Sequence, residues 1–402
     1  MKYYLYISVN CVCMIPFTEA LERLLNAAGK LPAERVPLAY ANQRIVAGEI
    51  IADRDLPPFP KAAMDGYAVK ALSKEATFTI VGEQMAGEQP IATAKPDECV
   101  KIMTGAHVHS DLRYVVPFEE ANVSEGSMRL CKELTKSNIC QKGEDVKQGE
   151  VLIEAGTMLR PQHIGLMASV GVTEPLVSRR PSVGIVSTGD ELVSIEEFPN
   201  QQQIRNSNGI QLSAHLTQLG ISGIDYGIVK DEAGKLSQRI GQALKAHDVV
   251  LLSGGVSKGD KDFVPAICES LGVEEILHGI AVKPGRPTYC GRRGDTHVIG
   301  LPGNPVSVFV QFELLVKPFL YKLMGHDYRP NVQKGQLHQD YIRKNSRRHV
   351  WIPVWVDDEN VHLSRYNGSG DQAGLVHSNA LMCCPAGVNE LKKGSYVTVR
   401  SI

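Results

Sequence analysis

The segment from Asp248 to Asp262 constrains the fold more than any other part of this chain. Val249 to Leu252 is a short apolar run rich in β-branched residues, which is typical of a parallel strand covered on both faces. Gly254, Gly255 and Gly259 follow, and they allow backbone conformations and close approaches that a Cβ atom would block. Successive N–H groups can then point at an anion, so the pattern predicts a strand that runs into a ligand-binding turn.

Two carboxylates, Asp260 and Asp262, come directly after this turn. They would repel a phosphate unless a divalent cation such as Mg²⁺ bridged them through oxygen ligands and water. The alternative is a helix that begins with acidic residues, which is an ordinary arrangement.

Apolar strand-like runs and helical runs alternate from about residue 180 to 325. The predicted strands are Val183–Ser187, Gly223–Val229, Val249–Leu252 and His297–Gly300, and the predicted helices are Gln211–Leu219, Lys235–Ala246, Asp262–Leu271 and Val306–Met324. This alternation predicts a doubly wound parallel sheet within an α/β protein. Such sheets bind ligands at the carboxyl ends of their strands.

Five carboxylates follow the predicted strands directly: Asp190, Glu191, Asp231, Asp260 and Asp262. Acidic side chains gathered at the ligand-binding edge of a sheet are candidates for catalysis or metal binding. Their shared position favours the ligand-binding interpretation of the glycine turn over the capped helix.

The chain of 402 residues is too long for a single hydrophobic core, so several domains are expected. Hydrophobic residues make up 43% and charged residues 22%, which is ordinary for a soluble globular protein. A net charge of −1 without a basic stripe argues against nucleic acid as a partner, and no run approaches the length of a membrane span. Nine cysteines without a paired framework fit a cytoplasmic protein.

The regions outside the sheet predict three further domains. We expect a helical domain from residues 14–48 and 143–178, in which Arg160–Val170 packs on the first helix, and an inserted β-rich domain over residues 49–142. The sheet domain covers residues 179–326, and a β domain follows over residues 327–402. Met1–Met14 is expected to be a non-exported arm, and we hypothesise that translation starts at Met14.

A stiff cationic segment, Lys283–Pro287, lies inside the sheet domain. Pro284, Gly285 and Pro287 surround Lys283 and Arg286. A rigid loop loses less entropy when its cations capture an anion. The spacing therefore favours a binding loop over two unrelated surface cations.

Several motifs, taken in order, resemble the molybdopterin molybdenumtransferase family, known as MoeA in bacteria and as the E domain of gephyrin in animals. The motifs are Pro57–Val69, Lys101–Ala106, Gly143–Val146, Ser187–Leu192, Asn206–Asn208, Ser253–Asp262, Lys283–Pro287, Leu301–Pro305 and Gly368–Gly370 with Asn379. Any one of them is weak, but their succession over nearly the whole chain is specific.

The resemblance implies an enzyme of the last step of molybdenum cofactor assembly. Such an enzyme accepts adenylylated molybdopterin and molybdate, inserts the metal and releases AMP, with Mg²⁺ as cofactor. The resemblance also implies a MogA-like molybdopterin-binding sheet domain and a homodimer whose cleft lies between the sheet domain of one subunit and the β-rich domain of the other. The resemblance also points to the upstream molybdopterin adenylyltransferase as a further partner.

The resemblance implies functional roles for individual residues. The implied catalytic acids are Asp65, Asp145, Glu191, Asp231 and Asp262, of which Glu191, Asp231 and Asp262 are also the expected metal ligands. The implied substrate- and phosphate-binding residues are Thr104, Thr188, Gly189, Asp190, Ser253, Gly254, Gly255, Ser257, Gly259, Lys283, Gly285, Arg286, Pro302 and Asn304. Asp65 and Asp145 have the alternative role of holding turns.

The chain departs from the family pattern at the loop His107–Arg113, at Lys61, where serine is frequent, and at Arg286, where lysine is common. Two other functions stay open. An adenylyltransferase shares the sheet domain but lacks the extra domains, and a non-catalytic pterin-binding scaffold would bind its ligand without releasing AMP.

Overall fold

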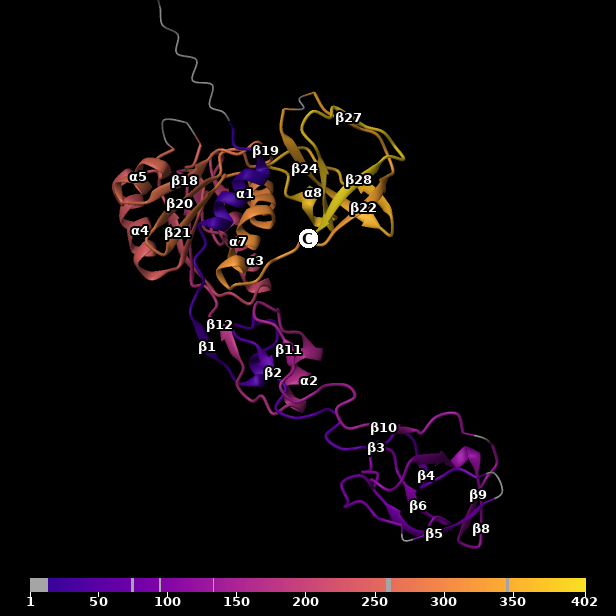
Figure 1. Cartoon of the computed structure of the whole chain (residues 1–402). Helices are drawn as coiled ribbons and strands as arrows, with labels where there is room; N and C mark the ends of the chain where they lie inside the picture. The colour runs from indigo at the N-terminus through magenta and orange to yellow at the C-terminus, as the bar shows by residue number, and fades with distance from the viewer. Residues whose placement is uncertain (1–13, 74–75, 94, 133, 258–261, 345–346) are drawn as a thin grey trace, which may run out of the picture. The chain divides into compact units, whose positions relative to one another are not determined.

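The computed structural model describes residues 14–73, 76–93, 95–132, 134–257, 262–344 and 347–402 (Figure 1). The chain forms two compact units. The first contains the described residues up to Glu34 together with Ser178–Ile402, and the second is Arg35–Val177. The finer division into four domains stays a prediction.

A six-stranded sheet forms the centre of the first unit, in the order β16-β13-β17-β21-β20-β18. Its strands are β13 (Val183–Thr188), β16 (Gly223–Val229), β17 (Val249–Ser253), β18 (Glu274–His278), β20 (Tyr289–Arg293) and β21 (Thr296–Leu301). The four predicted strands are all present and run parallel. β20 and β18 extend the sheet in antiparallel pairing, which the sequence analysis did not foresee.

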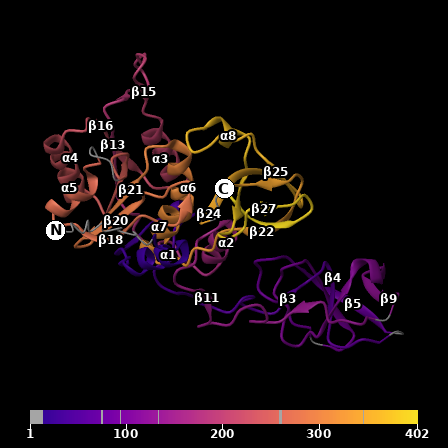
Figure 2. The same cartoon turned by 90° about the horizontal axis from the view of Figure 1, so that it is seen from above.

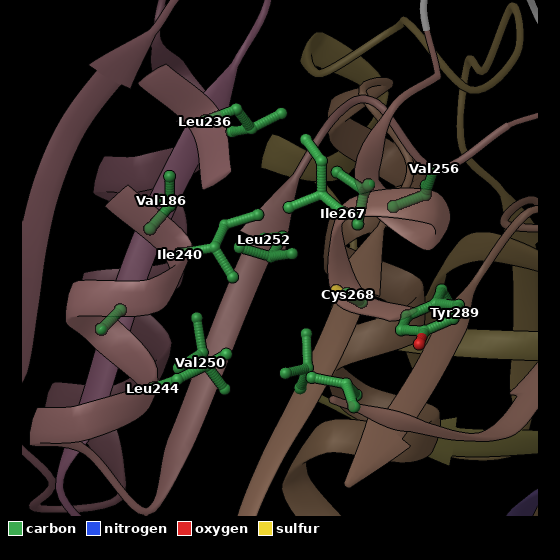
Figure 3. Close-up of a cluster of buried hydrophobic side chains, with 14 of the residues drawn as sticks. Val186, Leu236, Ile240, Leu244, Val250, Leu252, Val256, Ile267, Cys268 and Tyr289 are labelled. Atoms are coloured by element: carbon green, nitrogen blue, oxygen red, sulfur yellow. The ribbon is translucent and has the colours of Figure 1, made fainter. Parts of the chain in front are cut away.

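Helices cover both faces of this sheet, as the doubly wound prediction requires (Figure 1). They are α1 (Phe17–Asn26), α3 (Ser207–Gln218), α4 (Ala233–Ala246), α5 (Val264–Ser270), α6 (Pro305–Gln311), the π-helix η3 (Phe312–Val316) and α7 (Lys317–Leu323). Successive side chains of a strand point to opposite faces. Val186 accordingly joins the core under α4 and α5 (Figure 3), while its neighbour Ile185 lies near Leu216 of α3.

The structure corrects one expectation about the first helix. α1 contacts β18 and α7 in the first unit, and Phe17 makes an edge contact with Trp351 at 6.2 Å between ring centroids. The segment expected to pack on it forms α2 (Pro161–Ser169), which belongs to the second unit and contacts the 3₁₀ helix η1 (Leu38–Tyr40). Periodicity can predict an apolar face of a helix but cannot tell which partner covers it.

The C-terminal part of the first unit is a closed barrel. Its strands are β22 (Val332–Leu337), β24 (His349–Asp357), β25 (Asn360–Leu363), β26 (Ala380–Cys384) and β28 (Tyr396–Ser401), and the pairing of β24 with β26 closes the ring. β19 (Val282–Lys283) comes from the sheet domain and pairs with β24, with Lys283 opposite Val350. The barrel therefore holds the cationic segment by backbone hydrogen bonds.

Shorter elements complete the first unit: β14 (Leu192–Val193), β15 (Ile204–Arg205), β23 (Tyr341–Ile342), β27 (Glu390–Leu391) and α8 (Ala373–Val376). β14 pairs with β15, and the segment that carries β15 projects beyond α3 (Figure 2).

The second unit is rich in β-structure, as predicted for its central part. A six-stranded sheet has the order β7-β4-β6-β5-β9-β8, formed by β4 (Gly66–Val69), β5 (Thr77–Gln84), β6 (Glu98–Ile102), β7 (Tyr114–Pro117), β8 (Ala121–Ser124) and β9 (Ser127–Leu130). The other elements are η2 (Phe118–Glu120), β2 (Ile50–Ile51), β3 (Lys61–Ala62), β10 (Ile139–Cys140) and β11 (Val151–Ile153), with β1 (Ala33–Arg35) and β12 (Leu176–Ser178) at the unit boundaries. Within the described residues, no helix is both long and apolar enough to span a bilayer.

A buried polar cluster forms where the π-helix passes α3. Glu313 accepts a hydrogen bond from Lys317 at 2.9 Å, and its other carboxylate oxygen lies 3.7 Å from Nδ1 of His215. His215 stacks on Phe312 at 4.3 Å between ring centroids. Burial, and then the positive charge of Lys317, lower the pKa of His215 from 6.5 to about 4. At neutral pH this histidine is therefore uncharged, and its contact with Glu313 is no ion pair.

This pKa predicts an acid-sensitive contribution to stability. The unfolded chain binds a proton at His215 near pH 6.5 and the folded chain only near pH 4, so stability is lost as the pH falls through this window. The largest loss is about 3 kcal/mol. Urea unfolding of a His215→Gln variant should show a flatter dependence on pH between 6.5 and 4 than the wild type. His377→Gln, at an exposed histidine, is the control, and equal slopes for wild type and His215→Gln would contradict the prediction.

Candidate active site

Three parallel strands end at the same level of the sheet. Ser187 of β13 lies opposite Ser253 of β17, and Ser253 lies opposite Leu301 of β21. The loops that follow these strands therefore start side by side, at the edge where such sheets bind ligands. Most of the residues that the sequence predicts for the site lie in these loops.

The turn after β17 depends on glycine. Gly254 has a φ of +96° and donates its N–H to the carbonyl of Leu301 at 3.0 Å. A Cβ atom on Gly254 would lie 2.3 Å from the carbonyl oxygen of Thr188, well inside contact distance. Gly255 continues the turn with a φ of +65°. The predicted close approach of backbones is thus present, and it joins the loops after β13, β17 and β21.

One buried amide ties the same loops to helix α3. Asn208 donates from Nδ2 to Oγ of Ser253 at 2.8 Å and to the carbonyl of Gly303 at 2.7 Å. Asn206 caps the helix by accepting the N–H of Gly209 at 3.2 Å. Because both bonds of Asn208 are buried or partly buried, losing them would leave polar groups unsatisfied.

The acidic residues after β13 and β16 form a second linked group. Thr188 donates from Oγ1 to Asp231 Oδ1 at 2.6 Å, and the N–H of Asp231 donates to Asp190 Oδ1 at 3.2 Å. Lys230 adds a bond from Nζ to the carbonyl of Asp190 at 2.7 Å. Glu191 is exposed beside them, and a Cβ atom on Gly189 would lie 2.7 Å from its carboxylate.

A cavity of about 630 Å³ opens over this edge. Its lining residues are Thr188, Glu191, Leu192, Pro199, Gln203, Ile204, Arg205, Asn206, Ser207, Asn208, Ser253, Gly303, Asn304, Pro305, Gly370 and Gln372. Half of these residues carry side-chain amides or hydroxyls, and the lining also has one carboxylate and one guanidinium. Such groups can both donate and accept hydrogen bonds, as the edge of a neutral heterocycle requires.

A second cavity, of about 400 Å³, shares Gly303 and Asn304 with the first. Its other lining residues are Gly255, Val256, Ser257, Asp262, Lys283, Pro284, Gly285, Arg286, Pro287, Pro302, Ser307, Arg348 and Ser369. It is lined by three cations, Lys283, Arg286 and Arg348, and within the described ranges Asp262 is its one acid.

The positive charges that line the smaller cavity repel one another. Burial, and then the positive charge of Arg286, lower the pKa of Arg348. Like charges that converge on one cavity repel each other until an anion lies between them. The geometry therefore suits the binding of an oxyanion, and guanidinium groups can grip such an ion with two parallel hydrogen bonds.

Glycine also shapes the cationic segment. Gly285 has a φ of +107°, and a Cβ atom there would lie 2.2 Å from the amide nitrogen of Gln311. Gln311 donates to the carbonyl of Pro284 at 2.8 Å, and Thr288 donates to the carbonyl of Gly285 at 2.8 Å. These buried bonds hold the segment between Lys283 and Arg286 in one shape.

Asp262 lines the smaller cavity, and its Oδ1 accepts the N–H of Ser257 at 2.9 Å. Gly259 and Asp260, also named by the sequence analysis, lie outside the described residues. The three expected metal ligands are spread along the edge: Glu191 lines the larger cavity, Asp262 the smaller one and Asp231 neither. The described part of the chain holds no group of three or more histidine, cysteine or acidic side chains suited to a metal, so this ligand set stays a prediction.

The remaining predicted residues belong to the second unit. Asp65 Oδ1 accepts hydrogen bonds from the N–H and Oγ1 of Thr104, both at 2.6 Å, and these two bonds lower the pKa of Asp65. Asp145 is exposed, and its N–H donates to the carbonyl of Leu56 at 3.0 Å. Asp65 therefore ties its own loop to the loop that carries Thr104, and its catalytic role stays a prediction.

Many lining residues of the two cavities were absent from the predicted site, among them Asn208, Arg348, Ser369 and Gln372. Asn208 and Ser369 lie within motifs that carried the family resemblance, but neither was given a role. Arg348 precedes strand β24 far along the chain, and no local pattern indicates that the barrel brings it to Lys283.

Two family descriptions match the chain. Residues 15–171 match the MoeA N-terminal region (domain I and II), and residues 184–322 match the probable molybdopterin binding domain. A molybdopterin molybdenumtransferase of Staphylococcus aureus is 30% identical over 397 residues, covering 96% of this chain and 95% of the relative. The chain belongs to the molybdopterin molybdenumtransferase family. The resemblance noted in its motifs is confirmed.

Solved MoeA structures share the whole fold. The molybdopterin biosynthesis MoeA protein from Pyrococcus horikoshii OT3 aligns with a TM-score of 0.85 and 28% identity over 97% of this chain and 100% of that one. Another MoeA structure, from Pyrococcus horikosii, gives a TM-score of 0.81 and 30% identity over 96% and 99%. These likenesses confirm the predicted α/β multidomain fold with its MogA-like sheet domain.

The turn after β17 yields a test. Gly254→Ala places a methyl group against the Thr188 carbonyl, whereas Gly272→Ala adds one at a similar φ of +76° with no atom within 4 Å. The positive φ alone costs an alanine about 1–2 kcal/mol. We expect Gly272→Ala to lose about that much and Gly254→Ala to lose clearly more, measured by urea unfolding. Equal losses would show that the close approach is not a constraint.

Proposed function

We propose that this protein inserts molybdenum into adenylylated molybdopterin, releasing AMP and forming the molybdenum cofactor. The observation that carries the proposal is the family likeness over nearly the full chain, combined with two joined cavities of different chemistry at the strand edge. One cavity suits an oxyanion and the other a heterocycle. A reaction that brings molybdate to a pterin needs both.

The cationic cavity is the proposed site of molybdate and of phosphate oxygens. Lys283, Arg286 and Arg348 neutralise the negative charge that develops when the pyrophosphate link of the substrate is cleaved. Two of these residues come from one stiff segment and the third from the barrel, which pairs with that segment through β19. Because the groups are fixed before the anion arrives, little reorganisation is needed at the moment of reaction.

Mg²⁺ is the proposed cofactor, and the carboxylates along the strand edge are oxygen donors of the kind that this ion prefers. The ion prefers oxygen ligands and is often held by one or two carboxylates together with substrate phosphates and water, so a site with few protein ligands is suitable. Glu191, Asp231 and Asp262 are the residues that would hold it. When bound, Mg²⁺ would neutralise charge on the phosphate oxygens.

Hydrogen-bond donors of the chain hold two of these carboxylates in place. Thr188 Oγ1 donates to Asp231 and the N–H of Ser257 donates to Asp262, and each bond orients the carboxylate that accepts it. Thr188 belongs to a buried strand end and Ser257 to the glycine turn. The acids are thus held by the same loops that form the cavities.

We further propose a homodimer in the cytoplasm, in which Asp65, Thr104 and Asp145 of one subunit complete the site of the other. Asp65 and Thr104 are exposed, and their hydrogen bonds join two loops into one surface that is suitable for insertion into a partner. The upstream adenylyltransferase is the proposed donor of the substrate. The alternative that this chain is itself such an adenylyltransferase is not favoured, because its likeness to MoeA proteins spans the second unit and the barrel as well.

The role of Asp262 can be tested directly. Asp262→Ala should lower AMP release from adenylylated molybdopterin, in the presence of molybdate and Mg²⁺, by about 100-fold or more, because a carboxylate that would hold Mg²⁺ beside the phosphate would be lost. Asp327→Ala, at an exposed acid that lines neither cavity, is the matched control and should retain the wild-type rate. Wild-type turnover by Asp262→Ala would remove this residue from the mechanism.

Metal dependence gives a second test. Treatment of the wild-type protein with EDTA should abolish AMP release, and added Mg²⁺ should restore it, since the acids at the strand edge would otherwise repel the phosphates. The readout is AMP quantified by chromatography before and after chelation. AMP release that continues unchanged in EDTA would contradict the proposed cofactor.

A further inference from the structure

A short segment of the barrel, Asn367–Gln372, reaches the sheet domain and contacts the site; we name it the strap. The carbonyl of Ser369 accepts the N–H of Val306 at 3.1 Å, and its Oγ accepts Nδ2 of Asn304 at 2.8 Å. Gln372 donates from Nε2 to Oγ of Ser207 at 2.8 Å. Three hydrogen bonds therefore attach this segment to the starts of α6 and α3.

Bonds within the strap give it a defined shape. Asp371 accepts the N–H of Asn367 at 2.9 Å and the N–H of Gly374 at 3.3 Å, and its own N–H donates to the carbonyl of Gly368 at 2.9 Å. Gly368 has a φ of +124°, a conformation that favours glycine. The side chains of Ser369 and Gln372 are thus presented from a preformed turn.

The strap lies where the two cavities meet. Ser369 lines the cationic cavity, whereas Gly370 and Gln372 line the larger one. Gly303 and Asn304 line both, and Asn304 is the residue that binds Ser369. The strap and this loop of the sheet domain together form a partition.

The chemistry changes across the partition. On one side lie Lys283, Arg286 and Arg348, and on the other the amides of Asn206, Asn208 and Gln372. The guanidinium of the larger cavity, Arg205, is engaged by the Glu197 carbonyl at 3.0 Å and lies 6.0 Å from the Phe198 ring. An oxyanion is favoured on the first side and an uncharged ring with donors and acceptors on its edge on the second.

We propose that the strap is a positioning element that sets the oxyanion and the heterocycle of the substrate at a fixed separation. Ser369 limits the oxyanion cavity, and Gln372 holds the wall of the heterocycle cavity by its bond to Ser207. This inference rests on the proposed function, because it assumes that one substrate occupies both cavities. The heterocycle is a planar ring with hydrogen-bond donors and acceptors on its edge, which the pterin and the adenine of the substrate both supply.

Binding measurements on the full chain test the proposal without turnover. Calorimetric titrations of wild type, Gln372→Ala and Ser369→Ala use three probes: molybdate, 6-hydroxymethylpterin and adenosine. One lost hydrogen bond changes an affinity by roughly tenfold. Gln372→Ala should lower the affinity for one of the two ring compounds, 6-hydroxymethylpterin or adenosine, by about that factor. It should change the affinity for molybdate less than about twofold. Ser369→Ala should lower the affinity for molybdate and change the affinity for both rings little. The ring compound whose affinity falls in Gln372→Ala is the one that occupies the larger cavity.

Two further variants separate positioning from folding. Gln372→Glu keeps the side-chain length but removes the amide donor, so it should reproduce the selective effect even if the alanine variant folds poorly. Gln336→Ala removes an amide that bonds the Gly394 carbonyl elsewhere in the barrel, and it should leave all three affinities unchanged. In turnover, Gln372→Ala should raise KM for adenylylated molybdopterin more than it lowers kcat.

Three results would each overturn the proposal. They are an equal loss of affinity for all probes in both strap variants, unchanged affinities in both variants, and no binding of either ring compound to the wild type. A wild type that binds the probes with the expected selectivity but releases no AMP would overturn the proposed function and leave the strap in place. The two failures are therefore distinguishable.

Discussion

The site depends on the alignment of three parallel strand ends. Ser187, Ser253 and Leu301 lie abreast in the register of β13, β17 and β21, so the loops after them begin at one edge. Gly254 can then lie against the Thr188 carbonyl, and Asn208 can bridge Ser253 and Gly303. A shift of one residue in any of these strands would turn its side chains to the other face and separate the loops. The acids, the glycine turn and both cavities follow from this alignment.

The barrel completes what the sheet edge begins. β19 pairs with β24 and brings Arg348 to the cavity that Lys283 and Arg286 line, while Ser369 and Gln372 come from another loop of the same domain. A sheet edge alone would supply acids and backbone donors but fewer cations. This combination places cations beside the acids of the sheet edge, as the proposed reaction requires.

Much of the fold could be predicted because its signals are local. Four short apolar runs predicted the four parallel strands, and the buried β-branched runs of β13 and β17 are the clearest of them. The glycines after β17 predicted the ligand-binding edge. β18 and β20 were missed because Glu274 and Arg292 make them resemble exposed segments. The partner of α1 was predicted wrongly because an apolar helix face does not indicate which element packs on it. Arg348 and Gln372 reach the site only through long-range pairing, which no local pattern encodes.

The central claim is that molybdate lies among Lys283, Arg286 and Arg348, beside the larger cavity that holds the heterocycle. Crystals of the full chain grown with molybdate, and measured at the molybdenum absorption edge, test it most directly. We predict an anomalous peak within the cavity lined by these three cations, within hydrogen-bonding distance of at least two of them. A peak found only elsewhere on the protein, with this cavity empty at saturating molybdate, would contradict it.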